Sequence, residues 1–255
     1  MASGSSNLVQ YCQPIGDQKK CGSCLGWGST GIWECNLKKL KGENIKLSEN
    51  YFFCAPGSTC TNGNSELAIL EQAKKGCPTE ECWPYSPVDK QCGAGRCKSW
   101  WLTGKKIQNW VAVTDAEQMK TLLDSEALMG LMAVHQSFVS YVSGVYHSLG
   151  NSDPVIGYHC IGIVGYDDTR GAWLIRNSWG TGWGSKCDVG AGYCWIKYGN
   201  SEIDNVMFQF VLNGEIPPEP EPQPSPCTVG NLAAKILGFF PWLFHRKGRF
   251  YYMNP

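Results

Sequence analysis

The chain has 255 residues, of which 43% are hydrophobic and 17% charged, a composition typical of a globular protein. The 22 basic and 22 acidic residues cancel, so the charge balance gives no reason to expect a nucleic-acid partner. Fourteen cysteines at scattered spacings indicate disulfides formed in an oxidising compartment, secreted or lysosome-like. Zinc binding is the alternative, but the spacings lack the paired ligand motifs of zinc sites, so we expect no metal and no cofactor.

The N-terminal part of the chain favours helices. Residues 1–6 are small and polar, and we interpret them as an added leader because they lack the apolar core of a secretory signal. A helix is predicted over 24–41, with an apolar face and a stop at Gly42. Each of its three glycines costs about 1 kcal/mol against alanine, which predicts a buried helix with backbone packed closely against it; they are Gly26, Gly28 and Gly31.

Two shorter helices are predicted next, one beginning at Ser48 and one over 65–75 with Gly76 as its C-cap. Residues 76–108 are predicted to be loops, because proline and glycine pairs interrupt any period. A helix capped by Thr114 or Asp115 runs to about residue 128, and strands follow at 131–134, 159–166, 172–177, 193–198 and 205–212. Helices first and antiparallel strands second predict an α+β chain of two halves, with a site in the cleft between them.

The C-terminal region differs in composition from the rest. Residues 217–226 alternate proline with polar residues, which predicts a stiff, extended linker (215–226) after a core domain that ends near Gly214. The tail, residues 227–255, is rich in aromatic and basic residues. We expect this tail to pack back on the core, and docking to a membrane surface or a partner is the alternative.

One cysteine has the context of a nucleophile. Cys24 follows the turn Gly22-Ser23 at the start of the predicted helix, where the helix dipole is expected to lower the pKa of a thiol. Gln18 could donate its amide N–H to a developing oxyanion. A cysteine nucleophile also needs a base and a group that orients the base. Of the four histidines, His159 is the candidate base and Asn177 its candidate orienting partner, against the alternatives of a structural histidine and a glycine-rich hairpin with packed tryptophans.

Taken in order, these segments resemble the papain-like cysteine peptidases. The resemblance is carried by Gln18 with 21–24, by His159 with 164–166, and by the run Asn177-Ser178-Trp179-Gly180-Thr181-Gly182-Trp183-Gly184, and it covers about residues 12–212. It implies a peptidase domain over 7–214, with a helical half (about 20–108) and an antiparallel, β-barrel-like half (about 109–212) around an active-site cleft. It implies a cysteine endopeptidase that acts through a thiolate–imidazolium pair and an acyl-enzyme. Peptides or proteins would be its substrates, and a propeptide or a protein inhibitor could occupy the cleft.

The resemblance also implies a role for individual residues. Cys24 would be the nucleophile, His159 the general base and acid, and Asn177 its orienting partner, while Gln18 and the Cys24 backbone N–H would form the oxyanion hole. Trp179 would cover the Asn–His hydrogen bond, and Gly63 would pair with the substrate backbone. The remaining candidate substrate-binding residues are Asn64 and Trp183. The chain departs from the family at residues 25–27, Leu-Gly-Trp in place of the usual Trp-Ala-Phe, which leaves substrate preference open.

Cysteine pairing follows the same resemblance. It implies the disulfides Cys21–Cys60 and Cys54–Cys92, and we expect Cys187 and Cys194, which flank a glycine-rich insertion, to form a third. Among Cys77, Cys82 and Cys97 at least two are expected to pair, in an order that the sequence leaves open, and Cys160 and Cys227 are candidates for unpaired thiols. Cys21 and Cys24 also form a Cys-x-x-Cys motif, so a thiol–disulfide redox protein is the rival function, and a relative that has lost catalysis is the third possibility.

Overall fold

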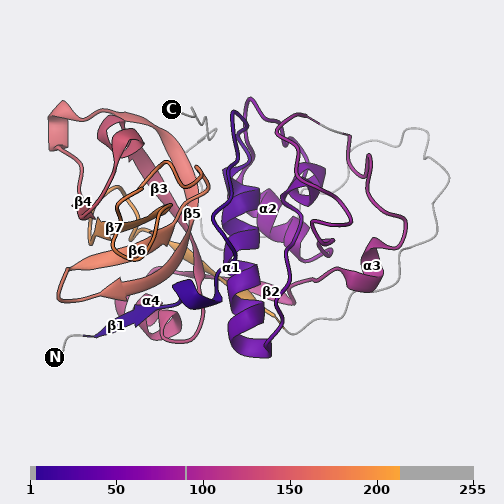
Figure 1. Ribbon diagram of the computed structural model, residues 1–255, viewed down its shortest axis with the longest axis horizontal. Coiled ribbons are helices and arrows are strands. Elements are labelled where there is room, and N and C mark those ends of the chain that lie inside the picture. Colours follow the sequence, from indigo (N-terminus) through magenta and orange to yellow (C-terminus); the bar gives the residue numbers. More distant parts are fainter. Residues whose placement is uncertain (1–3, 90, 213–255) are drawn as a thin grey trace, which may run out of the picture.

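The computed structural model describes residues 4–89 and 91–212. One long helix, α1 (Cys24–Lys41), runs through the middle of the molecule, and the other elements lie on either side of it (Figure 1). On one side lie η2 (Glu49–Cys54), a 3₁₀ helix, and the short helices α2 (Glu66–Ala73) and α3 (Trp100–Thr103). The sheet lies on the other side, so the predicted division into a helical half and a strand half is confirmed. The remaining helical segments are η1 (Val9–Tyr11), α4 (Ala116–Leu123), η3 (Gln136–Ser140) and η4 (Gly150–Ser152).

Helix α1 is the core element of the fold, and every residue from its start to Leu37 is buried. Its glycines permit this burial. A Cβ at Gly28 would lie 2.4 Å from Cys160 Sγ, and one at Gly31 would lie 2.8 Å from Arg176 Nη1. The close packing expected from the glycine content is therefore confirmed. Gly42, at a φ of 70°, ends the helix in the left-handed conformation that glycine adopts without strain.

The other predicted helices form with shifted ends. The segment after Ser48 is a 3₁₀ helix rather than an α-helix. Helix α2 begins after Ser65, whose hydroxyl oxygen accepts the Ala68 N–H at 3.4 Å, and it ends before Gly76. Helix α4 begins after Asp115, whose carboxylate accepts the Gln118 N–H at 2.8 Å, so the aspartate is the cap.

The described residues form one eight-stranded sheet in the order β2-β8-β3-β5-β6-β7-β4, with β1 paired to β5. All pairs are antiparallel except β4 with β7. The path is open, so the expectation of a barrel-like half is wrong. The strands are β1 (Ser5–Asn7), β2 (Asn109–Val113), β3 (Leu128–His135), β4 (Val145–Tyr146), β5 (Val155–Asp167), β6 (Ala172–Arg176), β7 (Tyr193–Lys197) and β8 (Met207–Val211).

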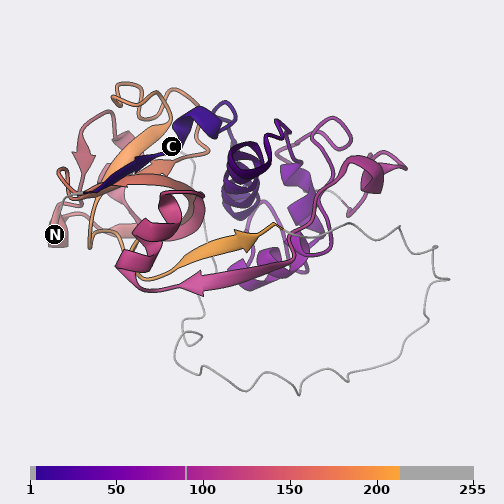
Figure 2. The same ribbon diagram turned by 90° about the horizontal axis from the view of Figure 1, so that it is seen from below.

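Strands β2 and β8 run side by side from the sheet toward the helical half, as Figure 2 shows. At the other end of the chain, β1 pairs with residues 165–167 of β5, where a Cβ at Gly165 would lie 2.1 Å from the Ser6 carbonyl oxygen. Ser5 and Ser6, which lie within the predicted leader over residues 1–6, therefore belong to the sheet. The sequence did not predict β1, because the strand has only three residues, all of them polar, and it forms by pairing with a distant segment that contains Gly165.

Residues 1–3, 90 and 213–255 lie outside the described part of the chain, and with them the predicted linker, tail and Cys227. Within the described part, no helix combines the length and apolar character that a membrane crossing requires.

Candidate active site

The first residue of α1 is Cys24, and its side chain is only 2% exposed. The backbone N–H of Cys160, the residue that follows His159 in β5, acts on the pKa of this thiol, because α1 packs against β5. Burial raises the pKa of the Cys24 thiol to about 11, opposed by the N–H groups of Cys160, Leu25 and Cys24 itself. The direction is opposite to that expected from the helix N-terminus alone, because the desolvation of a closed site outweighs the helix dipole.

His159 and Asn177 are joined as the sequence predicts. His159 is fully buried on β5, and its Nε2 lies 2.8 Å from Asn177 Oδ1. The same amide oxygen accepts the Ser178 backbone N–H at 2.8 Å, which fixes the orientation of the amide. Since an amide oxygen only accepts, Nε2 carries the ring proton and Nδ1 is an acceptor. Burial lowers the pKa of His159 to about 4, opposed by the hydrogen bond to Asn177.

Aromatic rings cover this hydrogen bond. The Trp179 ring lies 4.8 Å from the His159 ring between centroids, tilted by 35°. Phe138 and Trp183 also pack against Trp179, at 5.6 Å and 5.5 Å between centroids. Trp183 itself donates its ring N–H to the Phe138 carbonyl at 2.9 Å and is 6% exposed. Trp179 therefore contacts the His159 ring directly, whereas Trp183 contacts Trp179.

Gln18 is held from two sides. Its side-chain carbonyl accepts the Ser178 hydroxyl at 2.6 Å, and its amide nitrogen donates to the Cys21 carbonyl at 2.9 Å. The backbone N–H of Gln18 also donates to the Ser178 carbonyl at 2.8 Å. A glutamine amide has two N–H groups, so one remains after the bond to Cys21. Ser178 was not among the predicted site residues, although it directly follows Asn177 in the sequence.

The turn before Cys24 is braced by a disulfide and a tyrosine. Cys21 is bonded to Cys60, the pairing that the family resemblance implies. The hydroxyl of Tyr85 donates to the Gln18 carbonyl at 2.9 Å and lies 2.7 Å from the Ser23 hydroxyl. Tyr85 was not among the predicted site residues. Because the Cys21 sulfur is engaged with Cys60, Cys21 and Cys24 do not form a redox couple.

The predicted substrate-binding glycine is already engaged. Gly63 donates its N–H to the Thr59 carbonyl at 2.8 Å and accepts the Thr59 N–H at 3.2 Å. Its φ of 61° places it in the left-handed region, so it forms a tight turn beside the cleft. Pairing of Gly63 with a substrate backbone is thus limited to the second lone pair of its carbonyl oxygen.

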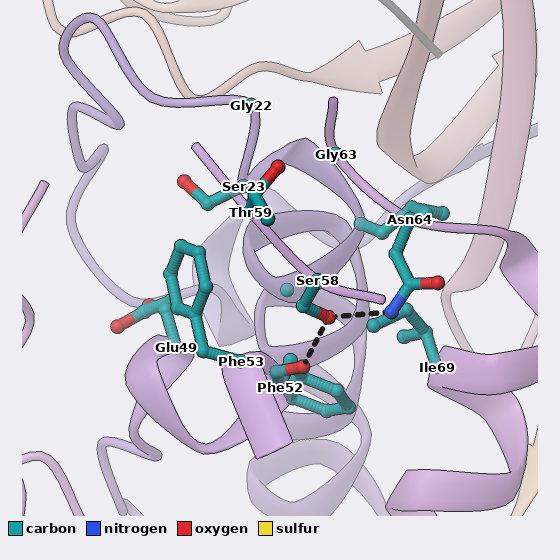
Figure 3. Close-up of a pocket in the computed structure, with 12 residues that line it drawn as sticks. Gly22, Ser23, Glu49, Phe52, Phe53, Ser58, Thr59, Gly63, Asn64 and Ile69 are labelled. Atoms are coloured by element: carbon teal, nitrogen blue, oxygen red, sulfur yellow. Dashed lines mark hydrogen bonds between the residues drawn. The ribbon is translucent and has the colours of Figure 1, made fainter. Parts of the chain in front are cut away.

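Asn64 lies at a small pocket on the helical side of Cys24 (Figure 3). Its amide donates to the Ser58 hydroxyl, which in turn donates to the Phe52 carbonyl at 3.0 Å. Leu25 lines this pocket, at the position where the family usually has a larger tryptophan. The remaining lining residues are Gly22, Ser23, Gly26, Glu49, Phe53, Thr59, Gly63 and Ile69.

The described cysteines form three disulfides. Besides Cys21–Cys60, they include Cys54–Cys92, which the resemblance implied. The third, Cys82–Cys97, shows which two of Cys77, Cys82 and Cys97 pair. Cys77 and Cys160 are thiols. The expected bond between Cys187 and Cys194 is absent, which is a correction. Instead, the Cys187 thiol donates to the Asp188 carboxylate at 3.8 Å, and the Cys194 thiol donates to the Trp195 carbonyl at 3.3 Å. Three disulfides fit folding in an oxidising compartment.

A cysteine at a helix N-terminus, beside a strand whose histidine is held by an asparagine, is the arrangement that cysteine-nucleophile hydrolases use. The sequence model of the papain family of cysteine proteases matches residues 5–210 of this chain. The chain belongs to this family. It is 31% identical to cathepsin K of Gallus gallus over 188 residues and 30% identical to cathepsin L2 of Homo sapiens over 193 residues.

These matches cover 69% of this chain but 54% and 55% of the two relatives, so the chain spans about half the length of the curated relatives it matches. Solved structures show the same fold. A cysteine protease of Carica candamarcensis in complex with E-64 superposes with a TM-score of 0.68 at 24% identity, over 82% of this chain and 99% of that protein. Bromelain protease of Ananas comosus with the E64 inhibitor gives a TM-score of 0.67 at 23% identity, with the same coverage.

Proposed function

We propose that this chain is a cysteine endopeptidase in which Cys24 is the nucleophile. The observation that carries the proposal is the packing of α1, which begins at Cys24, against β5, which carries His159, a histidine whose Nε2 is held by Asn177. Membership in the papain family supports the same reaction. Peptides and proteins are the proposed substrates, and a propeptide or a protein inhibitor is the proposed occupant of the cleft.

The pKa values define how the reaction begins. With the pKa of Cys24 at about 11 and that of His159 at about 4, each side chain alone is neutral at physiological pH. The reactive thiolate–imidazolium pair therefore forms by transfer of the Cys24 proton to Nδ1 of His159, the ring nitrogen that Asn177 does not contact. The two opposite charges then stabilise each other, and the helix N-terminus stabilises the thiolate.

The bond-making steps follow from the same geometry. The thiolate attacks the carbonyl carbon of the scissile peptide, and its oxygen takes the negative charge. The second amide N–H of Gln18 and the backbone N–H of Cys24 donate to that oxygen. The His159 imidazolium protonates the leaving amine, which releases the C-terminal product and leaves an acyl-enzyme at Cys24. A water molecule, deprotonated by His159, attacks the thioester and restores the free thiol.

The pocket beside Cys24 is the proposed site for a small apolar substrate side chain. Leu25, Phe52, Phe53 and Ile69 supply apolar walls, while the amide of Asn64 lies at one side (Figure 3). Since apolar pockets with few polar groups favour apolar ligands, we expect substrates with such a side chain to be preferred. Secretion or a lysosome-like location is proposed from the three disulfides.

Hydrolysis of a fluorogenic peptide library by the purified chain tests the proposal. The wild type should cleave internal peptide bonds, and Cys24→Ser should lose the activity because a serine hydroxyl does not give up its proton as readily. Cys187→Ser is the matched control, since it removes another thiol that is not part of the site. Retention of most of the activity in Cys24→Ser would show that the nucleophile is assigned wrongly.

A further inference from the structure

Two cysteines that take no part in the proposed reaction lie together between the N-terminal segment and α1. Cys12 follows η1, and Cys35 lies within α1. Both sulfurs contact one acceptor, the Leu8 carbonyl oxygen, with Cys12 Sγ at 3.6 Å and Cys35 Sγ at 3.7 Å. Each thiol also shifts the pKa of the other. The fold thus places two thiols against one carbonyl oxygen, in a protein that already forms three disulfides.

The two thiols differ in solvent exposure and in the direction of their pKa shifts. Cys12 is half-buried, whereas Cys35 is 0% exposed. The Cys35 thiol, the Arg176 guanidinium and the Tyr193 hydroxyl lower the pKa of Cys12, against burial and the nearby Glu34. The Cys12 thiol and burial raise the pKa of Cys35, against the charges of Arg176 and Lys38. Cys12 is therefore the thiol that ionises first and the one that a reagent can reach.

We propose that Cys12 and Cys35 are a thiol–disulfide exchange site, which a low-molecular-weight disulfide such as glutathione disulfide oxidises to a Cys12–Cys35 bond. The Cys12 thiolate attacks one sulfur of the small disulfide, whose S–S bond breaks and releases one thiolate. Cys35 then loses its proton, and its sulfur attacks the Cys12 sulfur of the mixed disulfide. The second small thiolate leaves and takes up a proton. Two protein thiols are oxidised, and one small disulfide is reduced to two thiols.

The new bond would join two parts of the fold that carry the catalytic groups. The segment after Cys12 leads to Gln18, and its Gln13 and Pro14 carbonyls accept the Arg176 guanidinium at 3.2 Å and 2.8 Å. Helix α1 carries Cys24 at its start. A covalent link between this segment and α1 restricts the unfolded chain, so the oxidised protein should unfold at a higher temperature than the reduced one.

Incubation of the native chain with glutathione disulfide, followed by alkylation, non-reducing digestion and mass mapping, tests the site. A cross-linked peptide pair containing Cys12 and Cys35 is expected, with a melting temperature that rises on oxidation. In Cys35→Ser the reaction should stop at the first step and leave glutathione on Cys12. In Cys12→Ser both the cross-link and the rise in melting temperature should disappear, while Cys77→Ser, which removes a buried thiol elsewhere, should retain both.

Two results would overturn the proposal. One is wild-type protein in which Cys12 carries glutathione while Cys35 remains a thiol, since the second step then fails in the native fold. The other is a native chain in which neither cysteine reacts, although both react after denaturation. Because neither readout requires peptide hydrolysis, the outcome is independent of the proposed peptidase function.

Discussion

The hydroxyl of Ser178 offers a sharp test of how the proposed oxyanion donor Gln18 is positioned. This hydroxyl donates to the Gln18 side-chain carbonyl at 2.6 Å, in a site where Gln18 is 0% exposed. Ser178→Ala deletes the donor but keeps the backbone N–H that holds Asn177 and the backbone carbonyl that accepts the Gln18 N–H. The change therefore acts on the orientation of the Gln18 amide and leaves the other catalytic contacts in place.

The magnitude follows from the loss of one of the two hydrogen bonds of the Gln18 side chain. A buried acceptor left without its donor costs about 1–3 kcal/mol, and about 1.4 kcal/mol corresponds to a tenfold change in an equilibrium or a rate. We expect Ser178→Ala to lower kcat by about 10-fold to 100-fold, because the misoriented amide donates less well to the oxyanion. Gln18→Ala, which removes the donor itself, should lower kcat by about 10²–10³-fold.

A double-mutant cycle on kcat separates positioning from a direct effect. If Ser178 acts only through Gln18, Ser178→Ala should lower kcat in the wild type and have little further effect in a Gln18→Ala background. Circular dichroism and thermal melting of each variant confirm that the comparison is made between folded proteins. Equal losses in the two backgrounds, or an unchanged kcat in the single variant, would refute the positioning role of Ser178.

Three further predictions concern the pocket, the core and a buried acid. Leu25→Trp should fill the pocket and so reduce the preference, measured as a ratio of kcat/KM values, for peptides with a small apolar side chain over peptides without one. Leu40→Trp, at a position 50% exposed on the same helix, should leave this preference unchanged. An unchanged preference in Leu25→Trp would show that the pocket does not select substrates. The Asn36 side chain donates to the Ala127 carbonyl at 2.9 Å and accepts the Ala127 N–H at 2.6 Å. Asn36→Ala should therefore lower the free energy of unfolding by about 1–3 kcal/mol for each group left unpaired, which is measured as a lower urea midpoint. An unchanged midpoint would contradict this role of Asn36. Burial raises the pKa of Glu34 to about 7 from 4.5, so the unfolded carboxyl ionises first and stability should fall as pH rises through this interval. In Glu34→Gln that part of the decline in melting temperature should be lost, and an unchanged pH profile would show that Glu34 is not its source.

Local signals predicted the elements whose start and stop are chemically marked. The helix over 24–41 was predicted with the bounds that the structure has, because its apolar residues share one helical face and Gly42 permits the left-handed stop. The cap of α4 was predicted to be Thr114 or Asp115, and the Asp115 carboxylate is the group that accepts a free helix N–H. The pairing of His159 with Asn177 was predicted from residue types and their order along the chain.

Features that depend on distant partners were missed. Strand β2 forms because it pairs with β8, nearly at the other end of the domain, and its own alternation is weak. The open sheet depends on tertiary geometry that no local pattern encodes. Burial, which the sequence does not quantify, raises the pKa of Cys24, whereas the backbone N–H groups at the helix start lower it as expected.

Labelling of the purified chain with a peptidyl epoxide, followed by peptide mapping, tests most directly whether Cys24 is a nucleophile that His159 activates. One label per chain is expected, on Cys24, and the label should be lost in His159→Ala while Cys187→Ser retains it. Labelling of another thiol in place of Cys24, or unchanged labelling of Cys24 in folded His159→Ala, would contradict the proposed catalytic arrangement.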